Sequence, residues 1–370
     1  MTPKTLKRIL IVISVILTVV VLVFIVYIFL INNKESSNIK VISEEKKEQE
    51  DNSKKAVVLI DDEIIDYDIS PSNAITYYKK SNGNTYSTNT QGGTNELVSD
   101  FEIKNLLKVE WAPTATFVLT NINSKYNLYN YVTKKSLSLP EGVLQAGILA
   151  DNSIYYLIQN PVGLYDLIVD SKDLDNKNNI IMLQMDKVLL QGIPLTTNIS
   201  QVMSPPSAFR ESPLRIIDTK QEITTSLLDA KYGLNVSWSP TGELGIITYS
   251  SDKAGKQMQM SLIDNLGKEQ MVFKSLGTLA EKIVWSKDGK NIYFTKPIIS
   301  DNRIMPDDYY DNSLGRFSEG LYHIDLTTFQ LNELSANIGS VDSRSLQLNE
   351  SGKELFFINR RDNKLYKYSL

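Results

Sequence analysis

Each of the three tryptophans in this 370-residue chain stands directly before a turn sequence, and an apolar run follows each turn. The stretches are WAPTATFVLT from Trp111, WSPTGELGIITY from Trp238 and WSKDGKNIYFT from Trp285. Proline presets φ for the first corner of a turn, and glycine adopts the positive φ that a tight hairpin often needs. Such turn residues are Pro71, Pro113, Pro240, Gly242 and Gly289. The pattern predicts a repeated strand–turn–strand unit.

The unit containing Trp238 continues as four short strand-like segments, LNVSW, LGIITY, QMQMSLIDN and EQMVFKS, separated by turns. Related turns recur along the chain at intervals of 42, 38, 43, 46, 47 and 63 residues, at Pro71, Pro113, Asp151, Pro194, Pro240, Lys287 and Glu350. Four strands in each unit of about 40–50 residues are typical of a β-propeller. A helical solenoid has a similar period, but no segment after Lys55 sustains a helical pattern. We therefore predict an all-β chain whose residues 55–370 form one propeller of seven four-stranded blades.

The three tryptophans are expected to fill space between neighbouring blades, because a large flat ring stands at the same place in each unit. The alternative, stacking on a ligand, would need only one of them. The final unit supplies three strands, the third at Lys364–Leu370, whereas Ala56–Ile60 is a surplus β-branched run ahead of the first unit. We expect Ala56–Ile60 to complete the last blade, since an open edge would leave backbone groups unpaired. The alternative is that AVVLI continues the linker.

WSPTGELGIIT and WSKDGKNIYFT, each followed by a strand such as LYHIDL, resemble the WD-like propeller repeats of the TolB C-terminal domain. Similar units occur in the propellers of prolyl-oligopeptidase-type hydrolases. The resemblance covers residues 55–370 and is strongest in the second, fifth, sixth and seventh units. It implies recognition of a protein or ligand on a propeller face. TolB carries a second N-terminal domain where this chain has an apolar segment, so its partners are not carried over.

The apolar segment Ile9–Ile31 contains no charge, proline or glycine. As a helix it would be about 35 Å long, which is enough to cross a bilayer, so we predict a transmembrane helix here. Lys4, Lys7 and Arg8 precede it, which predicts a cytoplasmic N-terminus at residues 1–8 and an extracytoplasmic remainder. A cleaved signal peptide is the alternative, but its apolar core is shorter and ends at small residues. Residues 32–54 are rich in Lys, Glu, Asn and Ser, which indicates a solvated tether or a short helical stalk.

Composition removes several classes of function. The net charge of −4 and the pI near 5.4 disfavour nucleic-acid binding. The chain has no cysteines, which excludes disulfides and thiol nucleophiles. Its single histidine, His323, lies in mid-strand, and the sequence contains no G-x-S-x-G motif for a nucleophilic serine. The sequence contains no metal-ligand motif with the required spacing, since Lys177 occupies a ligand position in DLDNKNN. We predict no catalytic residue, no metal and no cofactor.

One long segment of the sixth unit, KPIISDNRIMPDDYYDNSLGRFSEG, lies between its second and third strands. Long loops in compact domains are commonly functional, and Tyr and Arg are frequent at binding hot spots. The candidate contact residues are Arg303, Asp307, Asp308, Tyr309, Tyr310, Asp311 and Arg316. The alternative is a loop folded over the propeller whose aromatic residues cover the mouth of the central channel.

Two classes of function remain open at this level. The first, which we favour, is a membrane-anchored, extracytoplasmic propeller that binds an envelope protein or peptide as a non-enzymatic scaffold. The second is a propeller enzyme, or an accessory subunit of an envelope hydrolase, with a site over the central channel. Three or more carboxylates converging at the channel mouth would favour the second.

Overall fold

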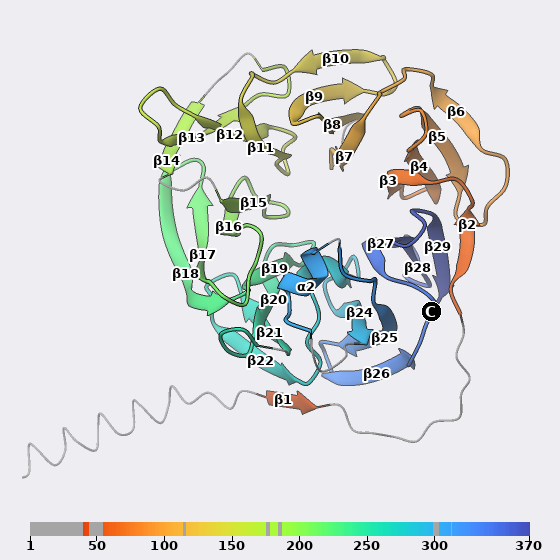
Figure 1. Cartoon of the computed structure of the whole chain (residues 1–370), viewed down its shortest axis with the longest axis vertical. Coiled ribbons are helices and arrows are strands. Elements are labelled where there is room, and N and C mark those ends of the chain that lie inside the picture. Colours follow the sequence, from red (N-terminus) through yellow and green to blue (C-terminus); the bar gives the residue numbers. More distant parts are fainter. Residues whose placement is uncertain are drawn as a thin grey trace, which may run out of the picture. The chain divides into compact units, whose positions relative to one another are not determined.

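Seven antiparallel sheets stand around a central axis in the computed structural model, which describes residues 40–43, 55–113, 116–174, 178–183, 187–255, 257–298, 303–311 and 313–370 (Figure 1). The predicted all-β propeller of seven blades is therefore confirmed. The predicted cytoplasmic N-terminus, the apolar segment Ile9–Ile31 and most of the predicted tether lie outside the described residues. No helix within the described ranges is long and apolar enough to span a bilayer.

Within residues 55–370 each blade contains four strands, and the first of them lies nearest the axis. Blade 1 contains β3 (Ile64–Ile69), β4 (Ala74–Lys79), β5 (Thr85–Asn89) and β6 (Glu96–Ser99). Blade 2 contains β7 (Leu106–Trp111), β8 (Phe117–Ile122), β9 (Lys125–Asn130) and β10 (Lys135–Ser138). Blade 3 contains β11 (Val143–Ile148), β12 (Ile154–Gln159), β13 (Tyr165–Asp170) and β14 (Asn178–Leu183).

Blades 4 to 7 repeat this order, except that the outermost strand of blade 7 comes from the beginning of the propeller. Their strands are β15 (Val188–Gly192), β16 (Ile199–Met203), β17 (Glu211–Asp218) and β18 (Ile223–Tyr232); β19 (Asn235–Trp238), β20 (Leu244–Ser250), β21 (Met258–Asp264) and β22 (Glu269–Lys274); β23 (Ile283–Trp285), β24 (Asn291–Ile298), β25 (Ser318–Asp325) and β26 (Gln330–Ser335); β27 (Ser343–Leu348), β28 (Glu354–Asn359), β29 (Leu365–Ser369) and β2 (Val57–Ile60).

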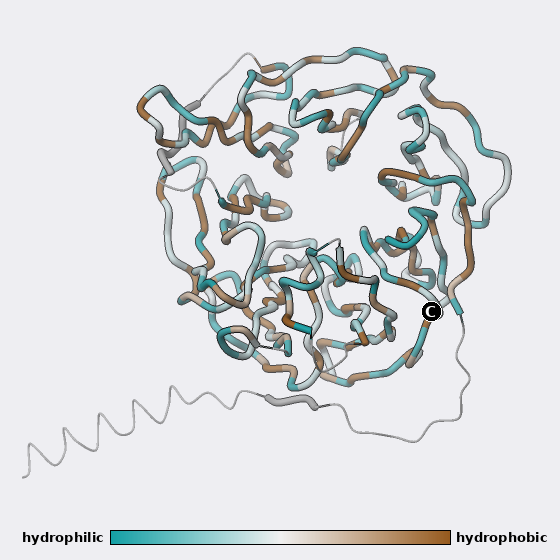
Figure 2. Tube along the Cα trace, viewed as in Figure 1, coloured by the Kyte–Doolittle hydropathy of each residue, from teal (hydrophilic) through white to brown (hydrophobic). Residues whose placement is uncertain are grey.

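The apolar core lies between neighbouring blades. In one buried cluster, Ile246 and Met260 of blade 5 pack with Ile292 and Phe294 of blade 6. Figure 2 shows hydrophobic residues on strands all around the ring, interspersed with hydrophilic ones. Each sheet therefore buries apolar side chains against the next blade, and no single central core is needed.

Strand β2 closes the ring as the sequence predicted. It pairs antiparallel with β29, with Val57 opposite Lys367 and Val58 opposite Tyr366. Figure 1 shows the two strands side by side although they come from opposite ends of the propeller sequence. The pairing covers the edge of β29, whose backbone groups would otherwise be open to other chains. A further strand, β1 (Lys40–Ser43), belongs to the segment predicted as a tether and pairs with β22.

The predicted turns connect the first and second strands of their blades. Pro71, Pro113 and Pro240 lie in three of these connections. Gly242 and Gly289 have φ of +70° and +69°, in the left-handed region that favours glycine. A Cβ on Gly242 would also lie 2.6 Å from the carbonyl oxygen of Pro194, in the corresponding turn of blade 4.

The tryptophans pack between blades, as expected. Trp238 is 5% exposed, and its indole Nε1 donates a hydrogen bond of 3.1 Å to Ser200 Oγ in blade 4. Trp285 is 7% exposed and donates similarly to Ser237 Oγ in blade 5, at 3.2 Å. Trp111 is only half-buried and lies 5.6 Å from the Tyr78 ring of blade 1. In each case the aromatic residue of one blade contacts the preceding blade.

Candidate functional site

The long insertion of blade 6 joins β24 to β25 and contains the short helix α2 (Asp307–Tyr310). Second-to-third-strand loops and the connections between blades share one end of the propeller, because strands alternate in direction. We call this end the loop face. Figure 1 shows α2 near the centre of the ring, beside the inner strands of blades 5 and 6.

Asp307 and its neighbours attach the insertion to blades 4 and 5. The Asp307 carboxylate accepts hydrogen bonds from Ser207 Oγ and from Ala208 N, both at 2.7 Å. Met305 N donates to the carbonyl oxygen of Gly255 at 3.3 Å. Pro306 approaches the backbone at Gly233 so closely that a Cβ there would lie 2.8 Å from the proline ring. Asp307 is therefore a structural residue of the loop.

Tyr309 is 3% exposed and packs in a small core with Met305 and Phe317. Two cations contact its ring, with Lys282 Nζ at 4.6 Å and the guanidinium carbon of Arg360 at 4.1 Å from the ring centre. Tyr309 was predicted to contact a partner. In the structure its side chain is covered by its own protein, and a role of Tyr309 in binding a partner stays a prediction.

A buried ion network lies beneath Tyr309. Lys282 Nζ contacts the Glu319 carboxylate, Asp342 Oδ1 at 3.0 Å and the carbonyl oxygen of Ser343 at 2.7 Å. Lys282, Glu319, Asp342 and Ser343 are fully buried. Burial would lower the pKa of Lys282, but the charges of Glu319 and Asp342 outweigh it and hold the pKa above its usual value. This network was not predicted from the sequence, because its members come from three separate segments.

Tyr310 points toward the connection between blades 5 and 6. Its hydroxyl donates a hydrogen bond of 2.8 Å to Glu281 Oε2. The Glu281 side chain is exposed at the surface, but the surrounding protein partly desolvates its carboxylate, which raises the pKa of Glu281. The hydrogen bond from Tyr310 opposes this rise. Tyr310 itself is half-buried, so part of it remains accessible on the loop face.

The remaining predicted contact residues have different surroundings. Asp308 accepts a hydrogen bond from Ile304 N at 2.9 Å and so closes the turn before α2. Arg303 lies over the Phe317 ring at 5.4 Å, and the backbone carbonyl of Arg316 accepts from Arg361 Nη2 at 3.2 Å. Asp311 is exposed; hydrogen bonds from Ser313 lower its pKa. Their role in binding a partner stays a prediction.

Two charged residues on the innermost strands were not predicted as site residues. Asp66 in β3 accepts a hydrogen bond from Tyr67 N at 2.9 Å, and burial raises its pKa to about 6. Arg344 in β27 donates from Nη1 to the carbonyl oxygen of Ile65 at 3.0 Å, and its charge opposes that rise. The only signal in the sequence was a carboxylate within the otherwise apolar first strand EIIDYDIS. Such a carboxylate is equally typical of a strand face exposed to solvent, so it did not predict a site.

His323 has a structural environment. Its ring stacks on Tyr293 with ring centres 4.6 Å apart, and its two nitrogens lie 2.8 Å from Asn291 Oδ1 and 3.3 Å from Asn332 Nδ2. Burial lowers its pKa. Among the described residues, no three Asp, Glu, His or Cys side chains gather closely enough to hold a metal ion.

These features define a seven-bladed WD-like β-propeller with a structured loop over one face. No protein-family model and no curated protein sequence matches the chain. Solved structures match it along most of its length. Oligogalacturonate lyase from Vibrio parahaemolyticus is 8% identical with a TM-score of 0.60, and the match covers 84% of this chain and 90% of that chain. The β-propeller domain of Cps50 (Swd1) from Myceliophteria thermophila is 10% identical with a TM-score of 0.55, and the match covers 85% of this chain and 99% of that chain. A chain of the Mitotic Checkpoint Complex is 16% identical with a TM-score of 0.54, and the match covers 88% of this chain and 96% of that chain.

At these identities the likeness establishes the fold and leaves the function open. The resemblance to WD-like and TolB-like propellers is confirmed at that level. The matched propellers include an enzyme and a chain of a protein complex, so their names favour neither class of function over the other.

Proposed function

We propose that this protein is a membrane-anchored, extracytoplasmic β-propeller that binds an envelope protein or peptide on its loop face as a non-enzymatic scaffold. The observation that carries the proposal is the construction of the blade 6 insertion. Contacts from blades 4, 5 and 7 fix it in place, through Asp307, Met305 and Tyr309 respectively. A loop that is fixed before binding loses little conformational entropy when a partner docks.

We call the accessible part of the blade 6 insertion, which contains Arg303, Tyr310, Asp311 and Arg316, the platform. Its side chains have suitable chemistry for binding a protein partner. Asp311 is exposed, and Arg303, Tyr310 and Arg316 are half-buried. Tyrosine and arginine side chains combine a large contact area with hydrogen-bond donors, which is why they predominate at binding hot spots. Mixed charge on the platform favours a partner that carries complementary charges of both signs.

Binding can be tested by crosslinking full-length protein in its native membranes and identifying captured envelope proteins. Asp311→Arg reverses a charge on the platform without touching its buried contacts, so we expect it to abolish capture of the specific partner. Glu243→Arg is the matched control, because Glu243 is exposed in a first-to-second-strand turn at the opposite end of blade 5. Equal capture by Asp311→Arg and the control would exclude this platform as the binding site.

Membrane anchoring rests on the sequence of Ile9–Ile31 and the basic residues before it. Protease added to intact cells or spheroplasts should digest the propeller, while an N-terminal fragment stays with the membrane. Protection of the propeller from protease would reverse the proposed topology. Release of intact propeller into the soluble fraction would favour a cleaved signal peptide instead.

A second candidate, an enzyme with a site near the ring axis, has one observation in its favour. The raised pKa of Asp66, next to the charge of Arg344, is a combination that occurs at catalytic sites as well as in structural networks. The protein can be incubated with oligogalacturonate, with and without manganese, because lyases for that substrate share the fold. Cleavage that Asp66→Asn abolishes would replace the scaffold proposal.

A further inference from the structure

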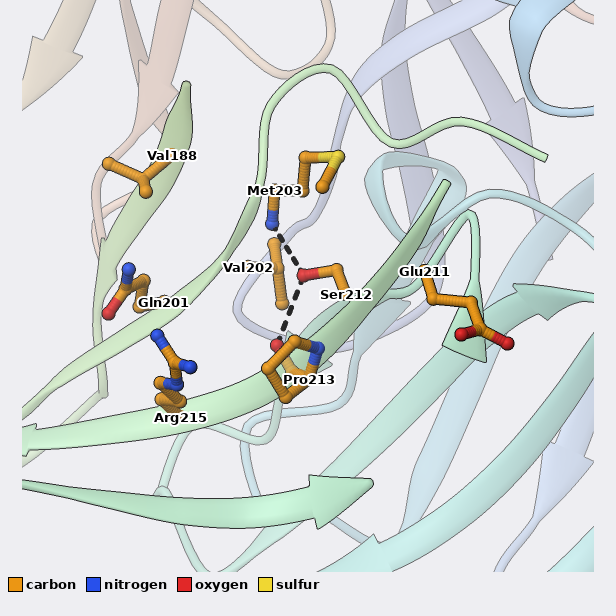
Figure 3. A pocket seen from close by; sticks show the side chains of 8 residues that line it. All are labelled: Val188, Gln201, Val202, Met203, Glu211, Ser212, Pro213 and Arg215. Atoms are coloured by element: carbon orange, nitrogen blue, oxygen red, sulfur yellow. Dashed lines mark hydrogen bonds between the residues drawn. The ribbon is translucent and has the colours of Figure 1, made fainter. Parts of the chain in front are cut away.

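The middle strands of blade 4 separate partway along their length. Strands β16 and β17 pair from Ile199 opposite Ile217 to Gln201 opposite Arg215, and the backbone pairing stops there. Pro213 has no N–H to continue it. Beyond this point Met203 N donates instead to Ser212 Oγ at 2.8 Å, and Ser212 Oγ donates to the Pro213 carbonyl oxygen at 3.1 Å (Figure 3). A side chain thus takes the place of the missing backbone partner, and the strands are spread apart.

A pocket of about 160 Å³ occupies the space beside this separation. Val188 and Met203 supply apolar surface, and Gln201 and Arg215 lie near each other in the lining (Figure 3). Because Gln201 and Arg215 are directly opposite each other on paired strands, their side chains project from the same face of the sheet. Val188 also belongs to the apolar cluster shared with blade 3, so the pocket borders the seam between blades 3 and 4.

Two of the polar side chains that line the pocket, Gln201 and Arg215, lack partners within the described part of the chain. The other polar lining residues are Ser212, which already bonds Met203 N, and the exposed Glu211. Gln201 is 5% exposed, and its Oε1 accepts no hydrogen bond. Arg215 is half-buried, and its guanidinium makes no hydrogen bond or ion pair with any described residue. A buried polar group without a partner destabilises the fold, and so does a partly buried charge without a counterion. A ligand that satisfies both groups would recover that free energy.

We propose that this pocket binds a carboxylate group. The guanidinium of Arg215 offers N–H donors in a fork that matches the two oxygens of a carboxylate. The Gln201 amide can turn its Nε2 toward the same oxygens, since its oxygen is not held by any donor. The short aliphatic part of the ligand would then contact Val188 and Met203. The volume resembles that of a cavity of about 150 Å³ known to bind benzene, so a carboxylate with two or three further carbons fits.

Such a carboxylate has two sources, a free small acid or a peptide that inserts an acidic side chain or its C-terminus. The pocket lies in blade 4 and shares no residue with the blade 6 platform, so this inference does not depend on the proposed function. Binding is measured on the full chain in detergent by saturation-transfer NMR and calorimetry. The probes are propionate and its neutral counterpart propionamide, together with a short acidic peptide whose C-terminus is either free or amidated.

Three variants separate the pocket from general electrostatics. Arg215→Met removes the cation and keeps the length of the side chain. Gln201→Glu is isosteric and places a like charge beside the ligand, so it keeps the proposal testable if Arg215→Met does not fold. Arg210→Met is the control, because Arg210 is an exposed arginine outside the pocket lining.

We expect propionate to bind the parent protein and Arg210→Met equally, and Arg215→Met and Gln201→Glu at least about tenfold more weakly. Propionamide should bind more weakly than propionate. Displacement of propionate by the acidic peptide would identify a peptide as the source, and failure of displacement would identify a small acid. Equal binding of propionate and propionamide, or retention of propionate binding in both pocket variants, would overturn the proposal.

Discussion

The guanidinium carbon of Arg360 lies 4.1 Å from the centre of the Tyr309 ring. Arg360 belongs to the second-to-third-strand loop of blade 7, and Tyr309 belongs to the insertion of blade 6. Arg360 also donates to the Tyr309 carbonyl oxygen at 3.3 Å, while Lys282, from the connection between blades 5 and 6, contacts the ring as well. The aromatic ring therefore fastens the insertion to its neighbouring blade.

Replacing Tyr309 with Ala should destabilise the propeller by about 2–4 kcal/mol, because it leaves a cavity and removes two cation–π contacts. Chemical denaturation measures the change in the free energy of unfolding. Tyr310→Phe is the control, since it removes only the hydroxyl that contacts Glu281 and should cost about 1 kcal/mol or less. Identical unfolding of Tyr309→Ala and the parent would show that the insertion is not attached as described.

Lys282→Met should cost about 3–5 kcal/mol, because it leaves the Glu319 carboxylate buried without its cation and Asp342 with Arg360 alone, at 3.5 Å. Lys287→Met provides a comparison, since the Lys287–Glu350 ion pair is largely exposed and such pairs contribute about 0–1 kcal/mol. Both variants can be compared in the same thermal melts. A loss for Lys282→Met no larger than that for Lys287→Met would contradict the buried network.

Trp238→Ala is expected to destabilise the protein by about 3–5 kcal/mol through loss of the contact between blades 4 and 5. Trp238→Phe retains much of the buried ring and loses the hydrogen bond to Ser200, so its effect should be smaller. Trp111→Ala should also cost less, because that ring is only half-buried. The order of the three melting temperatures tests the assignment, and equal melting temperatures would refute it.

Deletion of residues 55–60 should prevent cooperative unfolding or cause aggregation, since it removes β2 and exposes the edge of β29. Deletion of residues 44–49 of the predicted tether, which is equal in length, is the matched control. Circular dichroism melts and light scattering report the two effects. A protein without residues 55–60 that stays monomeric and melts like the parent would show that another segment closes the ring.

Asp66 predicts a dependence of stability on pH. Its pKa rises from the usual value of 3.8 to about 6 on folding, so the folded protein retains a proton that the unfolded chain has lost. Its stabilising contribution is therefore complete below pH 3.8 and disappears as the pH rises through about 6. Asp66→Asn, which mimics the protonated form, should stabilise the protein by up to about 3 kcal/mol at about pH 8 and leave it unchanged at about pH 4. Equal effects at both pH values would exclude the raised pKa.

Tyr309 and Tyr310 show where sequence reasoning about the site stops. They are adjacent in a polar loop, and both were expected to contact a partner. The structure buries Tyr309 against Arg360 and leaves Tyr310 half-exposed. Nothing in the local sequence separates the two, because the difference depends on Lys282 and Arg360, which lie 27 and 51 residues away along the chain.

The sequence by itself determined the blade architecture of this protein. Hairpins depend on neighbouring residues: a proline or glycine at the corner and alternating apolar residues beside it are sufficient to specify a turn and two strands. Repetition of that unit specified the number of blades, and a surplus β-branched run specified closure by β2.

Only the tertiary structure decided which polar residues meet. Lys282 and Asp342 come from two connections between blades and Glu319 comes from strand β25, whereas Gln201 and Arg215 acquire their pocket because Pro213 interrupts a pairing. Contacts of this kind depend on how the blades pack around the axis, and burial and charge then act between side chains that the sequence places far apart. Local pattern therefore specified the scaffold, and packing between blades created its candidate sites.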